Sequence, residues 1–209
     1  MPGKTLPMFP LGSVLFPYAV LPLRVFEPRY LELTHTCLQG DGRFGVVLIE
    51  RGYEVGGGDT RFSVGTVARI VEAARTPEGR YLLATVGTER FRVRRWLDDD
   101  PYPRAEVDMI SEPKRVPAGA AECRDRVERL LVRSLAMRSE LGERTAPVDA
   151  AQLDADPVRA SYEAASLAPI GSLDAQRLLE FDDALARLEA LEHVLVEEIE
   201  VLEFRLAQG

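Results

Sequence analysis

The segment that constrains the fold most strongly is LPMFPLGSVLFPYAVLPLRVFEPRYLELTHTCLQGDGRFGVVLIE, residues 6–50. Five prolines divide it into short apolar runs, and they are Pro7, Pro10, Pro17, Pro22 and Pro28. Because proline has no backbone N–H and a fixed φ, this spacing predicts neither a long helix nor a regular central strand. The apolar residues between the prolines still have to be buried, so we expect a chain that turns often around them.

Around this stretch the pattern predicts one short helix and several short strands. The helix covers Glu27–Leu38, with Pro28 in its first turn and Tyr30, Leu33 and Cys37 on one face. Apolar or alternating runs predict strands at 44–49, 62–76, 80–86, 90–97 and 105–110, and the glycine-rich residues 51–60 predict a loop. Six or so short strands with one helix predict a small, strongly bent sheet or partly open barrel.

From Pro117 onward the apolar period becomes helical. Helices are predicted at 118–141, 156–167, 172–181 and 182–206, with a polar connector at 142–156 and with Asp156 as the N-cap of the second helix. The last helix carries a one-sided apolar seam: Leu185, Leu188, Leu191, Leu195, Ile199, Leu202 and Leu206. Its opposite face is predicted to be solvated and carries Glu189, Glu197, Glu200 and Glu203. The sequence leaves open whether the seam packs internally or against a second copy of the chain in a homodimer.

The charge changes where the period changes. Residues 1–116 carry a net charge of +1 and residues 117–209 carry −9, which together give the −8 of the chain. We therefore expect two domains, 1–116 and 117–209, in an α+β protein. The acidic second half is not expected to contact nucleic acid directly.

The order of several short motifs resembles the N-terminal substrate-binding domain of the Lon protease family. The motifs are Phe9-Pro10-Leu11, Val14-Leu15-Phe16-Pro17, Leu21-Pro22-Leu23, Phe26-Glu27-Pro28-Arg29-Tyr30, Val64-Gly65-Thr66-Val67-Ala68 and Gly87-Thr88-Glu89-Arg90-Phe91. The resemblance implies a PUA-like, partly open β-barrel followed by a helical bundle. It also implies a role in recognising polypeptides, with unfolded segments or other proteins as partners.

The chemistry of a Lon machine is not expected in this chain. The GK[ST] at Gly3-Lys4-Thr5 has no strand and no glycine upstream, so it does not form a phosphate-binding loop. The only lysines are Lys4 and Lys114, and neither lies in a motif that matches the family's serine–lysine dyad. We therefore expect a stand-alone, non-catalytic protein that acts as an adaptor or chaperone-like module in protein quality control. A peptidase or another hydrolase with a cryptic site is the alternative.

Two groups of side chains are candidates for binding. An apolar surface that accepts peptides is predicted at Phe16, Pro17, Tyr18, Phe26 and Tyr30, although each of these could instead belong to the core. The one basic cluster lies at residues 90–95, where Arg92 and Arg94 are predicted to share a strand face. PUA-like folds include RNA-binding modules, so RNA binding through these two arginines is a third reading.

No cofactor, metal, disulfide or membrane contact is expected. His35 and Cys37 form an isolated H-x-C whose side chains would point to different faces of a helix. Cys37 and Cys123 are predicted to be buried thiols of a reducing compartment. The proline-broken N-terminus predicts neither a signal peptide nor a membrane span, so a cytoplasmic location is expected.

Overall fold

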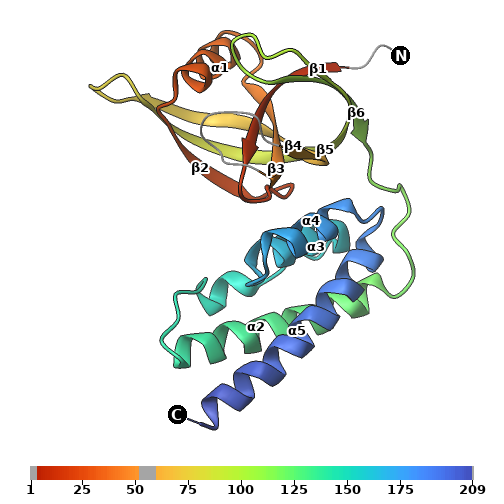
Figure 1. Ribbon diagram of the computed structural model, residues 1–209. Coiled ribbons are helices and arrows are strands. Elements are labelled where there is room, and N and C mark those ends of the chain that lie inside the picture. The colour runs from red at the N-terminus through yellow and green to blue at the C-terminus, as the bar shows by residue number, and fades with distance from the viewer. Residues whose placement is uncertain (1–3, 52–59, 209) are drawn as a thin grey trace. The chain divides into compact units, whose positions relative to one another are not determined.

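The computed structural model describes residues 4–51 and 60–208, and within them six strands and a helix precede a set of helices (Figure 1). Contacts divide the chain into two compact units, Met1–Ser111 (the β unit) and Glu112–Gly209 (the helical unit). The division falls before the 116/117 boundary that the charge pattern predicts. The predicted loop at 51–60 lies mostly outside the described residues.

The strands of the β unit form a bent, barrel-like sheet, which confirms the predicted α+β class. They are β1 (Lys4–Leu11), β2 (Val20–Val25), β3 (Arg43–Arg51), β4 (Thr60–Arg75), β5 (Tyr81–Leu97) and β6 (Arg104–Ile110), with helix α1 (Pro28–Gln39) between β2 and β3. Their order is β2-β5-β4-β3-β1-β6, and β6 also pairs with β5. Five strands therefore close a ring, while β2, within the described ranges, is paired only with β5.

The expectation that the prolines exclude a regular central strand is wrong for β1, because this strand lies between β3 and β6. Residues 4–7 pair with β6 and residues 8–11 pair with β3 in parallel. Each half of the strand is thus paired mainly on one side, so Pro7 and Pro10 can be accommodated without a lost ladder bond. The prolines mark a change of partner, not the end of a strand.

The two strands predicted at 80–86 and 90–97 are one continuous strand, β5, which changes its neighbour partway along. Its first half pairs with β2 and its second half with β6, while β4 pairs along both halves with register shifts. Gly87 lies where the change occurs, and a Cβ there would stand 2.1 Å from the carbonyl oxygen of Phe16. Glycine allows the incoming turn to pack directly on the bending strand.

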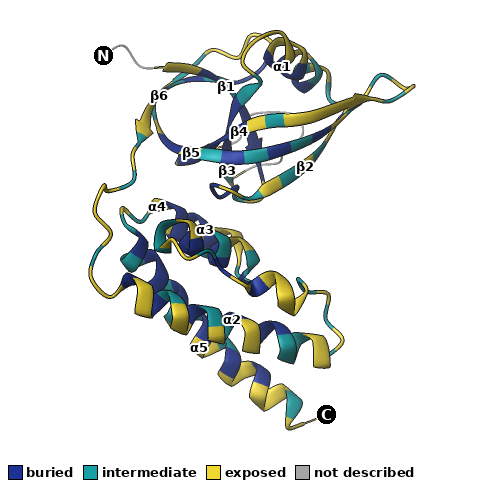
Figure 2. Ribbon diagram, turned by 180° about the vertical axis from the view of Figure 1, so that it is seen from behind, coloured by how far each residue is buried: buried dark blue, intermediate teal, exposed yellow. Residues whose placement is uncertain are grey.

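The alternation of β1 separates two apolar clusters. Phe9 and Leu11 belong to the cluster that includes α1, whereas Leu6 and Met8 belong to the cluster around Phe91. Successive strand residues point to opposite faces, so one strand contributes to both. Figure 2 shows the resulting buried positions along the strands and on α1.

The helical unit contains α2 (Ala120–Glu140), the 3-10 helix η1 (Val148–Ala151), α3 (Pro157–Leu167), α4 (Ser172–Glu180) and α5 (Ala184–Leu206). The predicted N-cap is present, since the Asp156 carboxylate accepts a hydrogen bond of 3.0 Å from the backbone N–H of Val158. The connector at 142–156 is less polar than predicted, because η1 and the next turn bury Ala151 and Leu153.

Most of the α5 seam is buried within the helical unit, where α5 packs along α2. Leu188, Leu191, Leu195, Ile199 and Leu202 are buried, and the terminal Leu185 and Leu206 are partly exposed. Of the described helices, none combines the length and apolar character that a membrane crossing requires.

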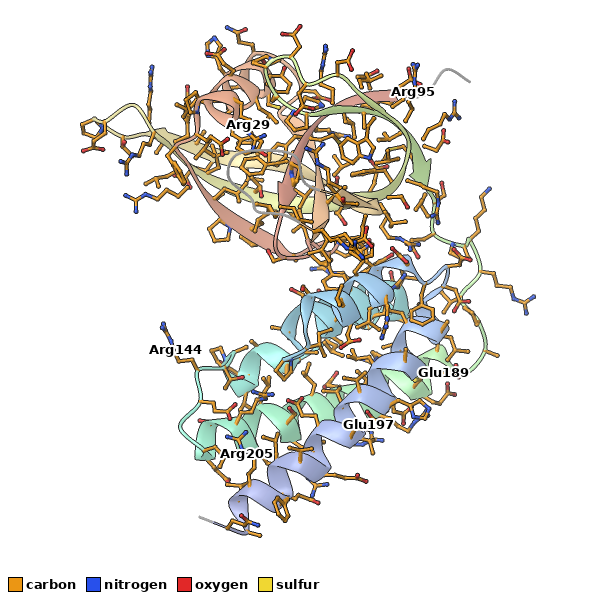
Figure 3. All side chains as sticks on the ribbon, viewed as in Figure 1. Arg29, Arg95, Arg144, Glu189, Glu197 and Arg205 are labelled. Atoms are coloured by element: carbon orange, nitrogen blue, oxygen red, sulfur yellow. The ribbon has the colours of Figure 1, made fainter. Side chains whose placement is uncertain are left out.

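Ion pairs connect the polar flanks of α2 and α5. Arg126 binds both carboxylate oxygens of Glu192, at 2.7 and 2.9 Å, and Arg138 binds Glu198. Arg133 binds Glu203, so this member of the predicted solvated face has a partner. Glu189, Glu197 and Glu200 are exposed, and the first two are labelled on α5 in Figure 3.

Candidate functional site

The β unit contains a pocket of about 210 Å³ beside β2. Phe9 and Leu11 contribute from the end of β1, and Tyr30 contributes from the first turn of α1. The other lining residues are consecutive and run along β2 into the loop before α1: Pro22, Leu23, Arg24, Val25, Phe26 and Glu27. The pocket is therefore mainly apolar and contains one basic and one acidic residue.

The aromatic wall of the pocket is held in place from both sides. The Tyr30 ring stacks on Phe9, with centroids 4.1 Å apart and an interplanar angle of 12°. The guanidinium of Arg29, labelled in Figure 3, lies 4.5 Å from the Tyr30 ring centroid and makes a 2.6 Å ion pair with Glu27. Both charged side chains of that pair are less than one-fifth exposed. The packing leaves these groups little freedom, which preorganises the wall.

The five predicted peptide-binding residues do not form one surface. Phe26, which is 56% exposed, and the buried Tyr30 both line the pocket. Tyr18 is exposed but lies in a separate turn, with φ of 68°. Phe16 and Pro17 are buried in a turn that two backbone hydrogen bonds hold against Gly87. The N–H of Tyr18 donates to the Gly87 carbonyl oxygen, and the Ala19 carbonyl oxygen accepts from the Gly87 N–H. Phe9 and Leu11 were recognisable from the sequence only as apolar, since nothing local shows that they meet α1.

The two arginines of the RNA-binding reading lie on β5. Both are exposed, and the register with β6 shifts between Val93 and Arg95, next to them. Arg94 makes a bidentate pair with Asp108 on β6, at 3.0 and 2.6 Å, and Asp108 is also the register partner of Arg92. Nucleic acid phosphates would have to compete with this carboxylate, so the arrangement does not favour strong RNA binding.

The isolated H-x-C motif is divided between two environments. The Cys37 thiol donates to the carbonyl oxygen of Arg43 at 3.3 Å, whereas the His35 ring lies 2.9 Å from the side-chain amide of Gln39. Burial, followed by the charge of Asp41, raises the pKa of Cys37 to about 12. A thiol that stays protonated is a poor metal ligand and nucleophile. In the described part of the chain, no group of three His, Cys, Asp or Glu side chains could hold a metal ion.

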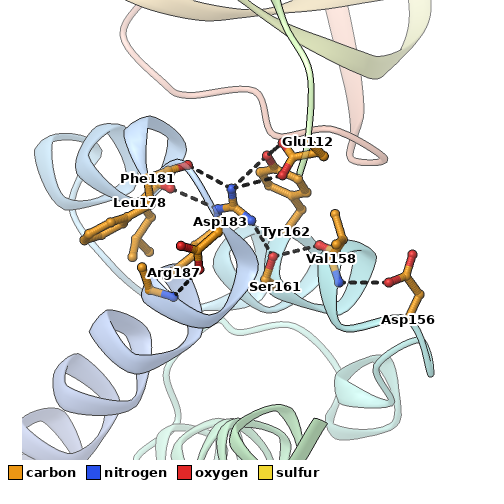
Figure 4. Close-up of polar contacts among 10 residues, drawn as sticks. Glu112, Asp156, Val158, Ser161, Tyr162, Leu178, Phe181, Asp183 and Arg187 are labelled. Carbon is orange, nitrogen blue, oxygen red and sulfur yellow. Dashed lines mark hydrogen bonds and ion pairs between the residues drawn. The ribbon is translucent and has the colours of Figure 1, made fainter. Parts of the chain in front are cut away.

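The helical unit contains a buried polar cluster around Arg187, which the sequence pattern did not single out (Figure 4). The Arg187 side chain is fully buried and donates to Ser161 Oγ at 2.6 Å and to the Tyr162 hydroxyl at 2.9 Å. It also donates to the carbonyl oxygens of Leu178 and Phe181, both at 3.1 Å.

The sequence does contain a feature that could have revealed this cluster. Arg187 is spaced from Ala184 and Leu191 so that it falls in the apolar stripe of α5. Glu112 lies 3.8 Å from the guanidinium and accepts a hydrogen bond from Tyr162. Because its donors are used within the fold, we interpret the cluster as structural: it joins α3, the α4–α5 turn and the start of the unit.

Comparisons with known proteins agree on one family. The model described as "ATP-dependent protease La (LON) substrate-binding domain" matches residues 5–197. The chain is 28% identical over 206 residues to a Lon protease of Cytophaga hutchinsonii, covering 97% of this chain and 25% of that protein. Where the match covers nearly the whole of this chain, the chain spans about a quarter of the length of the curated relative.

Two solved structures have the same fold. The crystal structure of a Lon N-terminal domain protein from Xanthomonas campestris is 30% identical, with a TM-score of 0.66 over 90% of this chain and 96% of that one. The N-terminal domain of a Lon protease from the Mycobacterium avium complex is 17% identical, with a TM-score of 0.68 over 94% and 98% of the two chains. The similarity therefore includes both the sheet and the helices.

Proposed function

This chain belongs to the family of ATP-dependent protease La (LON) substrate-binding domains, and on that premise we propose that it binds unfolded polypeptide segments at the β2 pocket. The family resemblance derived from the sequence is confirmed. The proposal concerns the ligand, and the pocket is the observation that carries it.

The size and lining of the pocket favour an apolar side chain of a polypeptide over a small-molecule ligand. Its volume of about 210 Å³ is below the roughly 300–1,000 Å³ typical of pockets that enclose drug-sized ligands. The walls supplied by Phe9, Leu11 and Tyr30 offer dispersion contacts and few hydrogen bonds. One large apolar side chain would fill such a site.

Phe26 extends the apolar surface beyond the pocket. More than half of its side chain is exposed, although it adjoins the buried Val25. Exposed aromatic side chains supply a large contact area at a low cost in conformational entropy, and they are enriched where proteins bind other chains. We therefore propose Phe26, the exposed aromatic residue of the pocket lining, as the main contact residue.

The test is binding of fluorescein-labelled, reduced and carboxymethylated α-lactalbumin, which stays unfolded, measured by fluorescence anisotropy. We expect Phe26→Asp to weaken binding about tenfold or more, as for a central contact residue. Phe204→Asp is the matched control, since Phe204 is 64% exposed and lies on α5. Equal losses for both variants, or none for Phe26→Asp, would refute the proposed site.

We propose in addition that the chain contributes recognition and not catalysis, in the manner of an adaptor or chaperone-like module. The support is the absence from its sequence of a lysine in a peptidase dyad motif. Turnover of a fluorogenic casein by the purified chain, with or without ATP, would contradict this part of the proposal and favour a cryptic hydrolase site.

A further inference from the structure

The pocket lies against the open edge of β2. In a strand, successive side chains point to opposite faces, so a cavity on one face contacts only alternate residues. This pocket instead contacts Pro22, Leu23, Arg24 and Val25 in succession. A cavity that contacts four consecutive residues has to adjoin the backbone edge of the strand, and β2 pairs with no strand except β5 among the described residues.

The hydrogen bonds of β2 indicate which backbone groups face that edge. The Ala19 carbonyl accepts a 2.9 Å hydrogen bond from the N–H of Gly87 on β5. In an antiparallel pair the backbone N–H and C=O of every second residue bond to the partner strand. The backbone groups of Leu21, Leu23 and Val25 therefore bond to β5, while those of Val20, Pro22 and Arg24 face the open edge. This register also places the proline where its missing N–H leaves no gap in the ladder. Beside the pocket, Arg24 is left with both an N–H and a C=O on the open edge.

The charges at this edge are not balanced. Glu27 already has an ion partner in Arg29, at 2.6 Å. Arg24 is exposed, and the described residues contain no carboxylate within ion-pair distance of its guanidinium. Arg24 acts electrostatically on Glu78 in the β4–β5 turn, whose pKa is lowered first by a hydrogen bond with Thr76 and to a lesser degree by Arg80 and Arg24. The pocket edge is therefore positive.

We propose that the bound polypeptide adds to β2 as a further strand, with an apolar–acidic–apolar sequence opposite Leu23, Arg24 and Val25. The inference rests on the proposed polypeptide-binding function and adds the substrate class. The residue opposite Arg24 has its side chain on the same face as the guanidinium, where a carboxylate is favoured. Its two neighbours point to the other face, toward the pocket walls formed by Phe9 and Tyr30.

The charge part of the proposal is tested with two fluorescein-labelled nonapeptides that differ only in their centre, Leu-Glu-Leu or Leu-Lys-Leu. We expect the lysine peptide to bind about threefold to tenfold more weakly, because a like charge replaces a favourable cross-strand pair. In Arg24→Glu the preference should reverse, so that the lysine peptide binds better. Arg80→Glu, on a nearby exposed arginine, is the matched control and should keep the original preference. A preference that does not change in Arg24→Glu overturns the proposal.

The strand part is tested by moving a single backbone N-methyl group through the five central residues of the Leu-Glu-Leu peptide. We expect alternate positions to lose about fivefold in affinity, because only every second N–H faces β2. A uniform profile, with or without loss, overturns strand addition even if the peptides bind. If neither these peptides nor carboxymethylated α-lactalbumin binds, the proposed function itself fails, and the inference fails with it.

Discussion

The β unit and the helical unit are stabilised by different kinds of interaction. In the β unit, apolar side chains pack closely on backbone, as Phe91 does over Gly45 and Gly65, where no room is left for a Cβ. The helical unit has an apolar seam as well, but its helices are also connected by arginine–glutamate pairs and by the buried Arg187. The whole net charge of −8 lies in the helical unit, since the β unit has equal numbers of acidic and basic residues.

This difference supports the proposal that the β2 pocket of the β unit is the binding site. The buried polar cluster of the helical unit uses its donors within the fold, whereas the β unit has an open strand edge beside a pocket. The sole tryptophan, Trp96, lies on β5, while far-UV circular dichroism is dominated by the helices. Unfolding of each unit can therefore be followed by its own spectroscopic signal, so variants of the two units can be compared directly.

Arg187→Met should destabilise the helical unit by about 3–5 kcal/mol, because the removed guanidinium leaves buried acceptors without donors. Urea unfolding followed by circular dichroism measures the loss, and Trp96 fluorescence should change much less. Arg177→Met is the control, since Arg177 makes an exposed pair with Asp174 and should cost less than about 1 kcal/mol. Equal losses for the two variants would show that the buried cluster is not structural.

The two cysteines should report the two units separately through their reactivity. Burial raises the pKa of Cys37 in the β unit to about 12 and that of Cys123 in the helical unit to about 11, from an ordinary value of 9.0. At pH 8 we expect alkylation by iodoacetamide to be slowed about a thousandfold at Cys37 and a hundredfold at Cys123. Mass spectrometry of the peptides gives both rates, and the protein in urea is the control. Alkylation of either native thiol at its unfolded rate would contradict the assigned burial.

Gly65→Ala should destabilise the β unit by about 1–3 kcal/mol, as for overpacking of a filled core. A Cβ there would lie 2.2 Å from the backbone oxygen of Val46 and 2.8 Å from the Phe91 ring, and the backbone cannot move aside as a side chain can. Urea unfolding followed by Trp96 fluorescence measures the effect. Gly171→Ala in the helical unit is the comparison and should cost less, because its nearest contact would be at 3.9 Å.

Arg126→Ala should have the smallest effect, and that effect should depend on pH. The hydrogen bond from Arg126 is the main reason that the pKa of Glu192 lies below its ordinary value of 4.5. A carboxyl whose pKa is lowered by folding stabilises the fold above its unfolded pKa, and the contribution disappears as the pH falls through the folded pKa. The urea midpoint of Arg126→Ala should therefore be lower than wild type at pH 7 and approach it below pH 4.5. Arg129→Ala, which removes the same charge without this partner, should show no such convergence.

Much of the fold followed from local patterns. The Pro28 helix start, the Asp156 cap and the leucine spacing of α5 are each encoded within a few residues, so their elements were predictable. The errors arose at Pro7, Pro10 and Gly87, where one strand changes its neighbour. Pro7 and Pro10 are tolerated because each half of β1 is paired mainly on one side, whereas Gly87 is required because the turn at Phe16 packs on it. Only the sheet topology shows where either case occurs.

The family followed from the order of short motifs between Phe9 and Phe91, while the α+β class, the helices and the aromatic candidates followed from composition and short-range periodicity. The tertiary structure alone decided that Phe26 and Tyr30 line a pocket while Phe16 and Pro17 are buried. It also placed Arg24 on an open strand edge and Arg187 inside a polar cluster. Pairing and burial bring together residues that are distant in sequence, so no local pattern contains that information.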